Sequence, residues 1–257
     1  MVLTTAQKVN GRLIEKTEKI SQELGVPYVS RKDRSLQRIY DDEKTNQILV
    51  VLDKQIKWYT RGIENPFFFH PGLSVVRIKR LLRGDNDIMI QACQLQPGDY
   101  FLDCTLGLAA DAIVASFVVG DKGRVVGVES ESMVAYLVGH GLKEVQQFPE
   151  IDQASRRIKV IHGNHLRLLE QMPDKSMDVV YFDPMFRRSI EVSSSVQQLR
   201  LFANLEPLSN AVMDQAKRVA RKRVVLKERK HSGEFSRLGF SMISKENKEV
   251  AYGVLEV

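Results

Sequence analysis

The sequence has little cysteine and no long apolar run. Only two of its 257 residues are cysteines, Cys93 and Cys104, and they form no CxxC pair. This excludes a disulfide framework and a zinc ribbon, and it is typical of proteins of the reducing cytoplasm, where we expect this chain to act. The best apolar stretch, residues 112–119, is much shorter than the about 18 residues that a membrane-spanning helix needs, so we expect no membrane partner. Residues 1–5 contain no basic start to an apolar segment, so we expect no secretory signal.

Positive charge is in modest excess. The chain has 38 Lys and Arg against 32 Asp and Glu, a net charge of +6. An excess of this size favours polyanionic partners, but many enzymes that act on small molecules are equally basic. The basic residues gather in two clusters, at 77–83 and 217–230. Each cluster is interpreted either as a set of phosphate contacts for an RNA or as a solvated helix face, and the sequence leaves both open.

A loop rich in proline and phenylalanine, residues 65–72, separates two regions of different pattern. Before it, apolar spacing predicts a helix over 6–24 and strands over 48–52 and 55–60. We therefore expect a small α+β N-terminal domain over residues 1–69.

From residue 70 to 257 apolar strands alternate with helical segments, which predicts a second, larger domain. Continuous β-branched runs separated by helices indicate a mostly parallel sheet that is covered on both faces, a doubly wound α/β domain. Ligands of such folds bind beyond the carboxyl ends of the strands. The strands are expected at 100–103, 124–128, 158–161, 178–182, 223–226 and 250–257, and the helices at 73–82, 87–95, 109–118, 131–147, 166–171 and 206–220.

The first two strand ends resemble a nucleotide site. Asp103 closes the first strand, and Gly107 in the following turn allows the backbone to approach a ligand at the start of a helix. Glu129, at the end of the second strand, is placed to accept hydrogen bonds from both hydroxyls of a ribose. A plain turn and a solvated strand-end acid are the structural alternatives. Ala109 stands where a dinucleotide fingerprint has its second glycine, so one nucleotide-like ligand is favoured over two.

The third strand end carries Asn164 and His165. A polar side chain here is placed to hold the far side of an adenine ring, and the alternative is that Asn164 caps the next helix. His165 has no Cys or second His at metal-ligand spacing, so we expect no metal. The two cysteines are interpreted as buried apolar residues rather than nucleophiles.

The fourth strand end, Asp183-Pro184-Met185-Phe186, carries the sharpest signal. A conjugated amino group is a poor nucleophile, because its lone pair is delocalised into the ring. Acceptors at Asp183 and Pro184 hydrogen-bond its protons and free that lone pair, while Phe186 stacks on the base. The alternative is a capped turn with a buried Phe. The Ser-rich segment 187–195 is interpreted as a loop over the substrate.

These motifs together resemble a known family. The order is Asp-x-Thr-x-Gly-Leu-x-x-Asp-Ala at 103–112, Glu129, Tyr-x-Asp-Pro-Met-Phe at 181–186 and Lys-Arg-Val-Val-Leu-Lys at 222–227. It resembles the class I S-adenosylmethionine methyltransferases, and more narrowly the ribosomal small subunit methyltransferase J family, which methylates the N2 amine of a guanosine in 16S rRNA. The resemblance implies a Rossmann-like fold with a mostly parallel seven-stranded sheet, S-adenosyl-L-methionine as cofactor, and the small ribosomal subunit as partner in rRNA processing.

The resemblance also implies roles for particular residues. The catalytic residues are expected at Asp183, Pro184 and Phe186. Cofactor contacts are expected at Asp103, Thr105, Gly107, Ala110, Asp111, Glu129, Ser130, Asn164, His165 and Asp183. Two other functions remain open: a methyltransferase for a small molecule, a protein or DNA, and an RNA-binding module that kept the fold and lost catalysis.

Overall fold

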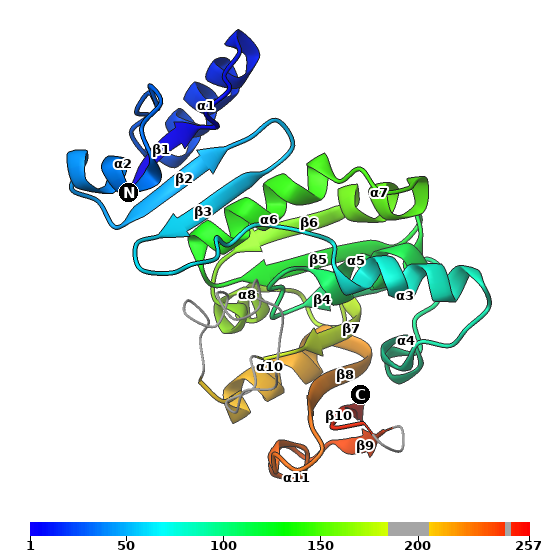
Figure 1. The fold of residues 1–257 in the computed structure, drawn as a ribbon. Coiled ribbons are helices and arrows are strands. Elements are labelled where there is room, and N and C mark those ends of the chain that lie inside the picture. The colour runs from blue at the N-terminus through cyan, green and yellow to red at the C-terminus, as the bar shows by residue number, and fades with distance from the viewer. Residues whose placement is uncertain (185–205, 245–247) are drawn as a thin grey trace. The chain divides into compact units, whose positions relative to one another are not determined.

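The computed structural model describes residues 1–184, 206–244 and 248–257 (Figure 1). It divides the chain into two compact units. The first is Met1–Phe69, and the second comprises the described residues from His70 to the C-terminus. Phe186 and the segment 187–195 lie outside the described residues. Among those described, no helix is both long and apolar enough to cross a bilayer.

The first unit is a small sheet with two helices. Its strands β1, β2 and β3 lie in that order, with β1 parallel to β2 and β3 antiparallel to it. The core includes Val2, Ile39, Tyr40, Ile48 and Val50. The elements are β1 Val2–Thr5, α1 Gly11–Leu24, α2 Leu36–Asp42, β2 Gln47–Val51 and β3 Ile56–Thr60.

The helix α1 shows how local sequence sets an element's limits. The side chain of Asn10 accepts a hydrogen bond from Leu13 N at 2.8 Å and caps the helix, which begins at Gly11, five residues after the predicted start at residue 6. Gly25 ends it with a left-handed φ of 63°. The apolar spacing thus predicted the helix, while its cap decides where it begins.

The second unit is built on a seven-stranded sheet in the order β6-β5-β4-β7-β8-β10-β9. Strands β6, β5, β4, β7 and β8 are parallel neighbours, and β10 is antiparallel to both β8 and β9. The winding reverses between β4 and β7, which is the switch point where such folds bind ligands. The strands are β4 Tyr100–Asp103, β5 Arg124–Glu129, β6 Ile158–His162, β7 Met177–Phe182, β8 Ala220–Arg229, β9 Ser241–Ile243 and β10 Val250–Glu256.

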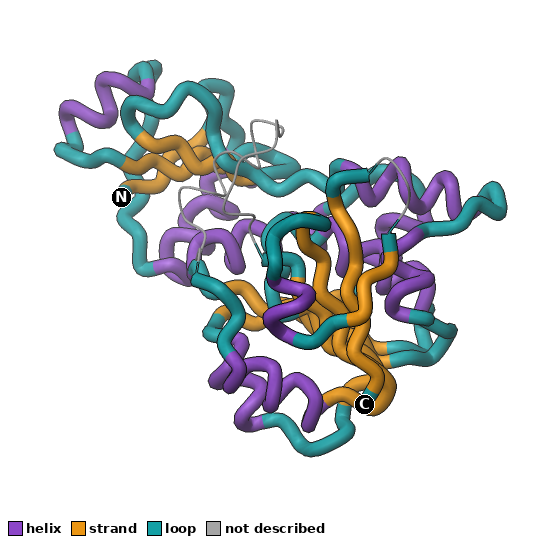
Figure 2. The backbone as a smooth tube through the Cα atoms, turned by 90° about the horizontal axis from the view of Figure 1, so that it is seen from below, coloured by secondary structure: helices purple, strands orange, loops and turns teal. Residues whose placement is uncertain are grey.

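Helices lie on both sides of this layer of strands (Figure 2). Helix α10 packs on β7, β8 and α8, while α5 packs on β4 and β5 with α3 and α7 against it. The predicted doubly wound α/β fold is therefore confirmed. The helices are α3 Leu73–Leu82, α4 Ile88–Cys93, α5 Ala110–Val119, α6 Ser132–Glu144, α7 Pro149–Arg156, α8 His165–Gln171, α10 Asn210–Val219 and α11 Glu234–Leu238.

The alternation of side chains along the strands separates two faces of the sheet. Leu102, Phe182 and Leu226 share one buried cluster with residues of α8, α10 and α11. Successive residues of a strand point to opposite faces, so the residues that follow them in sequence point toward the α3 and α5 side. Those residues are Asp103, Asp183 and Lys227.

Among the elements of the described residues, five were not predicted from the sequence: β1, α2, α7, α11 and β9. Each is short, with three to eight residues. A local signal existed for α7, because Pro149 occupies its first turn together with the acidic Glu150 and Asp152. Strand β9 is fixed by pairing with β10 rather than by its own pattern, and all three of its residues are exposed.

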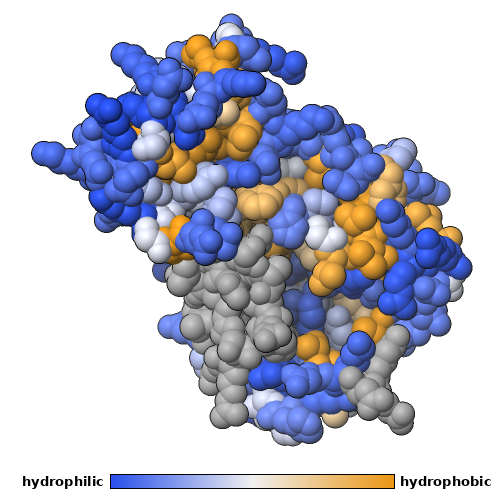
Figure 3. Space-filling model, in the orientation of Figure 1, coloured by the Kyte–Doolittle hydropathy of each residue, from blue (hydrophilic) through white to orange (hydrophobic). Residues whose placement is uncertain are grey.

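Helix α3 exposes apolar side chains to solvent. Leu73 is 72% exposed, Val76 56% and Leu82 53%. Figure 3 shows apolar side chains gathered over this helix. Its opposite face buries Ser74 and Ile78. The helix is amphipathic, but part of its apolar surface stays outside the core.

Candidate active site

The register of β7, β8 and β10 brings polar and charged residues together near the carboxyl end of β7. Phe182 pairs with Leu226, so Asp183 and Lys227, the next residue on each parallel strand, lie side by side. Tyr252 of β10 pairs with Lys227. These side chains come from distant parts of the sequence and meet only because of the strand order.

An ion-pair chain runs through this cluster. Lys227 Nζ lies 2.6 Å from Asp183 Oδ2 and 3.0 Å from Asp111 Oδ2. Tyr181 donates its hydroxyl proton to the same Asp111 oxygen over 2.8 Å. Arg77 pairs with the other Asp111 oxygen and with Asp87, whose Oδ2 lies 2.8 Å from the guanidinium Nε. Asp111 is therefore held by three donors of the protein.

Burial controls the protonation of these carboxyl groups. Burial raises the pKa of Asp183 to about 6, since Lys227 opposes the effect only in part and Asp111 adds to it. Burial likewise raises the pKa of Asp103 to about 8. The pKa of Asp111 is instead held well below its usual range, because Lys227 and Arg77 outweigh its burial. At neutral pH Asp103 is thus protonated, whereas Asp183 and Asp111 are ionised.

The turn between β4 and α5 has an unusual backbone. Gly107 has a φ of 48° and Ala109 a φ of 61°, both in the left-handed region. Ala109, which stands at the second glycine position, adopts the conformation for which glycine is favoured. Leu106 N donates to Val128 O at 2.9 Å and fastens the turn to β5.

A glycine of β5 makes room for this turn. A Cβ at Gly127 would lie 2.3 Å from the side chain of Leu106, which is 3% exposed. Such a contact forces Leu106 to move, because real Cβ atoms do not approach so closely. Gly127 is therefore required for the position of the turn.

Glu129 lies half-buried at the end of β5 and faces the same turn. Its Oε2 accepts a hydrogen bond from Gly107 N at 3.0 Å, and its Oε1 accepts from Glu131 N at 3.0 Å and from the Ser130 hydroxyl at 3.3 Å. Burial raises the pKa of Glu129, and the hydrogen bonds to its carboxylate oppose that effect. The structure thus brings Gly107, Glu129 and Ser130 together, as the sequence predicted for a ligand site.

Thr105 connects the ends of β4 and β7. Its backbone N donates to Asp103 Oδ1 at 3.0 Å, and its hydroxyl oxygen accepts from Asp183 N at 2.6 Å. Pro184 follows as a half-buried residue. These contacts hold the backbone at Asp183 beside the glycine turn. The residues expected to bind the substrate amine and those expected to bind the cofactor therefore lie at one edge of the sheet.

Asn164 and His165 lie beyond β6. Asn164 Oδ1 accepts from Leu166 N at 2.9 Å and Arg167 N at 3.3 Å, which is a helix N-cap. The His165 ring packs edge-on against Phe182, with 5.9 Å between the centroids. Burial lowers the pKa of His165, so it is neutral at pH 7. The capping alternative is therefore what the structure shows for Asn164, and a cofactor contact there stays a prediction.

The basic clusters are largely engaged in ion pairs. Arg77, expected as a phosphate contact or as a solvated side chain, is neither, because it is mostly buried between Asp87 and Asp111. In the second cluster six cations pair within the chain. They are Arg218 with Asp174, Arg221 with Asp178, Lys222 with Asp99, Arg223 with Glu256, Lys227 with Asp111 and Asp183, and Arg229 with Glu249.

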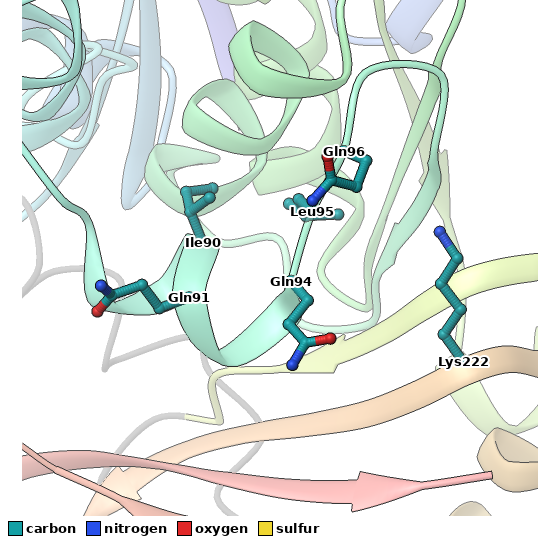
Figure 4. Close-up of a pocket in the computed structure, with 6 residues that line it drawn as sticks. All are labelled: Ile90, Gln91, Gln94, Leu95, Gln96 and Lys222. Atoms are coloured by element: carbon teal, nitrogen blue, oxygen red, sulfur yellow. The ribbon is translucent and has the colours of Figure 1, made fainter. Parts of the chain in front are cut away.

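A separate open pocket of about 530 Å³ lies between α4, the segment after it and the start of β8 (Figure 4). Lys222 lines it, and three glutamines and two apolar residues complete the lining: Gln91, Gln94, Gln96, Ile90 and Leu95. Lys222 precedes Lys227 by five positions on β8, a distance of roughly 17 Å along a strand. The pocket therefore belongs to the opposite end of the sheet. In the described part of the chain, no three His, Cys, Asp or Glu residues are grouped as a metal site.

Sequence reasoning missed the roles of Lys227, Arg77 and Tyr181 in this cluster. Lys227 was assigned only to a basic run and to the resemblance. A signal was present, because Lys227 directly follows the buried Val224, Val225 and Leu226, as Asp183 follows a buried strand. Nothing in the local sequence marks Arg77, whose position depends on how α3 packs against α5.

Comparisons with known proteins agree on the family. A family model described as "Putative SAM-dependent methyltransferase" matches residues 34–254. The uncharacterized protein YpiP of Bacillus subtilis is 38% identical over 256 residues, which cover 99% of both chains. The ribosomal RNA small subunit methyltransferase J of Pseudomonas paraeruginosa is 27% identical over 177 residues, 66% of each chain.

A solved structure supports the fold. The SAM-dependent methyltransferase NGO1261 of Neisseria gonorrhoeae aligns with a TM-score of 0.63 at 16% identity, covering 100% of this chain and 96% of that one. The resemblance to the class I fold, with S-adenosylmethionine as cofactor, is confirmed. The chain belongs to this family of S-adenosylmethionine-dependent methyltransferases.

Proposed function

We propose that this methyltransferase transfers the methyl group to an exocyclic amine of a nucleic-acid base, namely guanine N2 in 16S rRNA. One observation carries the proposal: the carboxyl group of Asp183, paired with Lys227 at 2.6 Å, stands at the switch point of the sheet beside the turn at Gly107, and Pro184 follows it. The methyltransferase J relatives add support through their name. The guanine N2 position rests on the family resemblance of the motifs at 103–112 and 181–186.

The residues beyond β4 and β5 fit S-adenosylmethionine. The left-handed turn at Gly107 and Ala109 brings backbone close to a ligand, and Glu129 lies beside it with a carboxylate oriented by three donors. In this proposal Glu129 accepts hydrogen bonds from the ribose hydroxyls. Of the three donors that already bind its carboxylate, the Ser130 hydroxyl makes the longest bond, at 3.3 Å, and is the one that a ribose hydroxyl replaces most easily. The cofactor supplies an electrophilic methyl group on a sulfonium.

The acceptor at Asp183 meets the needs of an amine substrate. A conjugated amine becomes nucleophilic when acceptors bind its protons, and an ionised carboxylate is a stronger acceptor than a neutral group. The ion pair with Lys227 uses Asp183 Oδ2. In the proposal the remaining acceptor capacity of Asp183 serves the amine, and the Pro184 carbonyl adds a second acceptor.

RNA as the substrate has a further, weaker support on α3. Its solvent face carries the basic Lys79 and Arg80 beside the exposed Leu73 and Val76, and Arg83 follows the helix directly. Arg80 also pairs with Asp85 at 3.2 Å. A basic face with apolar contacts suits a nucleic acid, and it predicts binding that weakens steeply with salt. Weak salt dependence would favour the small-molecule or protein alternative.

The experiment is methylation of purified 30S subunits from cells that lack this gene. Tritiated-methyl S-adenosylmethionine is supplied, and the RNA is then digested to nucleosides. The proposal predicts label in N2-methylguanosine. Label in another nucleoside would contradict guanine N2 but keep a base amine, and label in protein alone would contradict the nucleic-acid substrate. Cofactor binding without transfer to any substrate favours the non-catalytic module.

A further inference from the structure

Lys227 connects the expected amine acceptor to a fixed charge cluster. Its side chain is 23% exposed, that of Asp183 28% and that of Asp111 only 7%. Lys227 thus reaches from a buried carboxylate to a more accessible one. No other described cation forms an ion pair with Asp183.

Asp111 fixes the position of the lysine. It is itself held by Tyr181 and by Arg77, and Arg77 is held in turn by Asp87. The lysine ammonium therefore has one partner, Asp111, that two further donors hold in place. The arrangement restricts Asp183 through its Oδ2 atom.

We propose that Lys227 is the positioning residue for methyl transfer, holding Asp183 ionised and oriented through its Oδ2 so that the substrate amine is received on the rest of the carboxylate. The inference rests on the proposed function, since it assigns the amine to Asp183. Lys227 contacts Asp183 rather than the reacting atoms, so it acts through that residue.

The chemical step balances without further reactants. The amine nitrogen forms a bond to the methyl carbon as the carbon–sulfur bond breaks, and that electron pair goes to sulfur, giving a neutral thioether. The nitrogen then carries a positive charge and gives a proton to the Asp183 carboxylate, which releases it to solvent. Lys227 keeps its proton throughout, because the flanking carboxylates raise its pKa well above the usual value.

Several titratable groups surround Asp183, and they act in opposite directions. Burial raises its pKa, Asp111 disfavours a second negative charge, and Lys227 favours ionisation. Without Lys227 the like charges and the burial remain, so the carboxyl would stay protonated to higher pH. The charged and titratable groups that face this cluster are Lys227 on β8, Asp111 on α5, Asp103 on β4, Tyr181 on β7, Tyr252 on β10 and Arg77 on α3.

A double-mutant cycle tests the inference. Lys227→Met, Asp183→Asn and the double variant are compared with wild type, with Lys227→Arg as the conservative variant. Lys222→Met serves as the matched control, because this lysine also bridges two carboxylates but at the other end of β8. Single-turnover methylation of 30S subunits is measured against pH, S-adenosylmethionine affinity by calorimetry, and stability by urea unfolding.

We expect Lys227→Met to slow transfer at pH 7 by about tenfold and to move the acid limb of the rate profile up by about one pH unit. Lys227→Arg retains most of the rate. In the Asp183→Asn background, Lys227→Met changes the rate by less than about twofold, because the two residues act as a unit. Cofactor affinity stays within about threefold in Lys227→Met and Lys227→Arg. Lys222→Met leaves the rate unchanged.

The stability arm needs no substrate. Lys227→Met should lose stability as pH rises from 5 to 8, because Asp183 then ionises without its partner, and adding Asp183→Asn should restore part of that loss. The inference would be overturned if the two substitutions had additive effects on both the methylation rate and the free energy of unfolding. It would also be overturned if Lys227→Met left the acid limb of the pH–rate profile where it is in wild type. If the wild-type enzyme labels a different nucleoside, only the assignment of guanine N2 is contradicted. The double-mutant cycle is then measured with that nucleoside as the product.

Discussion

Strand β8 carries a lysine bridged to two carboxylates near each of its ends, and the two lysines differ in exposure. Lys222 lies with Asp99 and Asp178 and keeps 43% of its side chain exposed. Lys227 lies with Asp111 and Asp183 and is 23% exposed. At the amino end Arg221 stacks over Tyr100 at 5.1 Å, again at the surface.

The difference in burial separates structural ion pairs from a reactive cluster. Exposed pairs are screened by water and contribute little, typically about 0–1 kcal/mol. In a buried cluster the charges shift one another's pKa values, which is the feature that acid–base chemistry uses. The raised pKa values of Asp183 and Asp103 belong to the carboxyl end of the sheet, where the strand order predicts ligand binding.

The largest effect should come from Asp183→Asn. The variant keeps the size of the side chain but loses the charge that accepts from the amine, so methyl transfer should fall by about 100-fold or more. Asp178→Asn is the matched control at the amino end and should leave the rate unchanged. Rates are measured with saturating cofactor. If Asp178→Asn slowed transfer as much as Asp183→Asn, the functional distinction between the ends would be lost.

Glu129→Gln should weaken S-adenosylmethionine binding by about tenfold, or about 1.4 kcal/mol. The amide keeps one acceptor oxygen but cannot accept from both Gly107 N and Glu131 N while binding ribose hydroxyls. Calorimetry measures the affinity. An unchanged affinity would place the ribose elsewhere.

The sequence predicted the mostly parallel sheet and placed the candidate site at its strand ends, and the features that it missed have physical reasons. Strand ends such as Asp103 and Asp183 could be predicted because each acid directly follows a buried apolar run. The charge chain through Arg77 could not, because it depends on the packing of α3 against α5, which local patterns do not encode. For Asn164 the sequence was ambiguous, because an asparagine side chain at a strand end can either cap the next helix or contact a ligand.

Asp103→Asn tests the carboxyl end of the sheet through the pH dependence of the free energy of unfolding. The folded-state pKa of Asp103, about 8, lies above the usual carboxyl value of 3.8, so the folded protein favours the proton. The stability from this group is present below about pH 4 and is lost as the pH rises to about 8, by at most about 1.4 kcal/mol per pH unit. The Asp103→Asn variant keeps an acceptor oxygen for Thr105 N, but it has no carboxyl proton to lose, so this fall in stability with rising pH is absent.

Urea unfolding of wild type and Asp103→Asn at pH 5 and pH 8 measures the difference. The variant should gain stability relative to wild type at the higher pH. An equal difference at both values would show that Asp103 is not protonated in the folded protein.

Lys222→Met should have the smallest effect. Lys222 itself is 43% exposed, although its partners Asp99 and Asp178 are buried. Water therefore screens the ammonium group, and we expect a loss of about 1 kcal/mol or less in the free energy of unfolding, reduced further by salt. Urea unfolding at low and high ionic strength measures it. A loss that is large and insensitive to salt would contradict the contrast between the two ends of β8.

The most direct test of the central claim is the pH dependence of methyl transfer by the wild-type enzyme in single turnover, with cofactor bound in advance. The account requires an ionised Asp183 and therefore predicts a rate that is constant above about pH 6 and falls tenfold per pH unit below it. The residual activity of Asp183→Asn should lack this acid limb. A wild-type rate that stays constant down to pH 5, or an acid limb that persists in Asp183→Asn, would contradict the account.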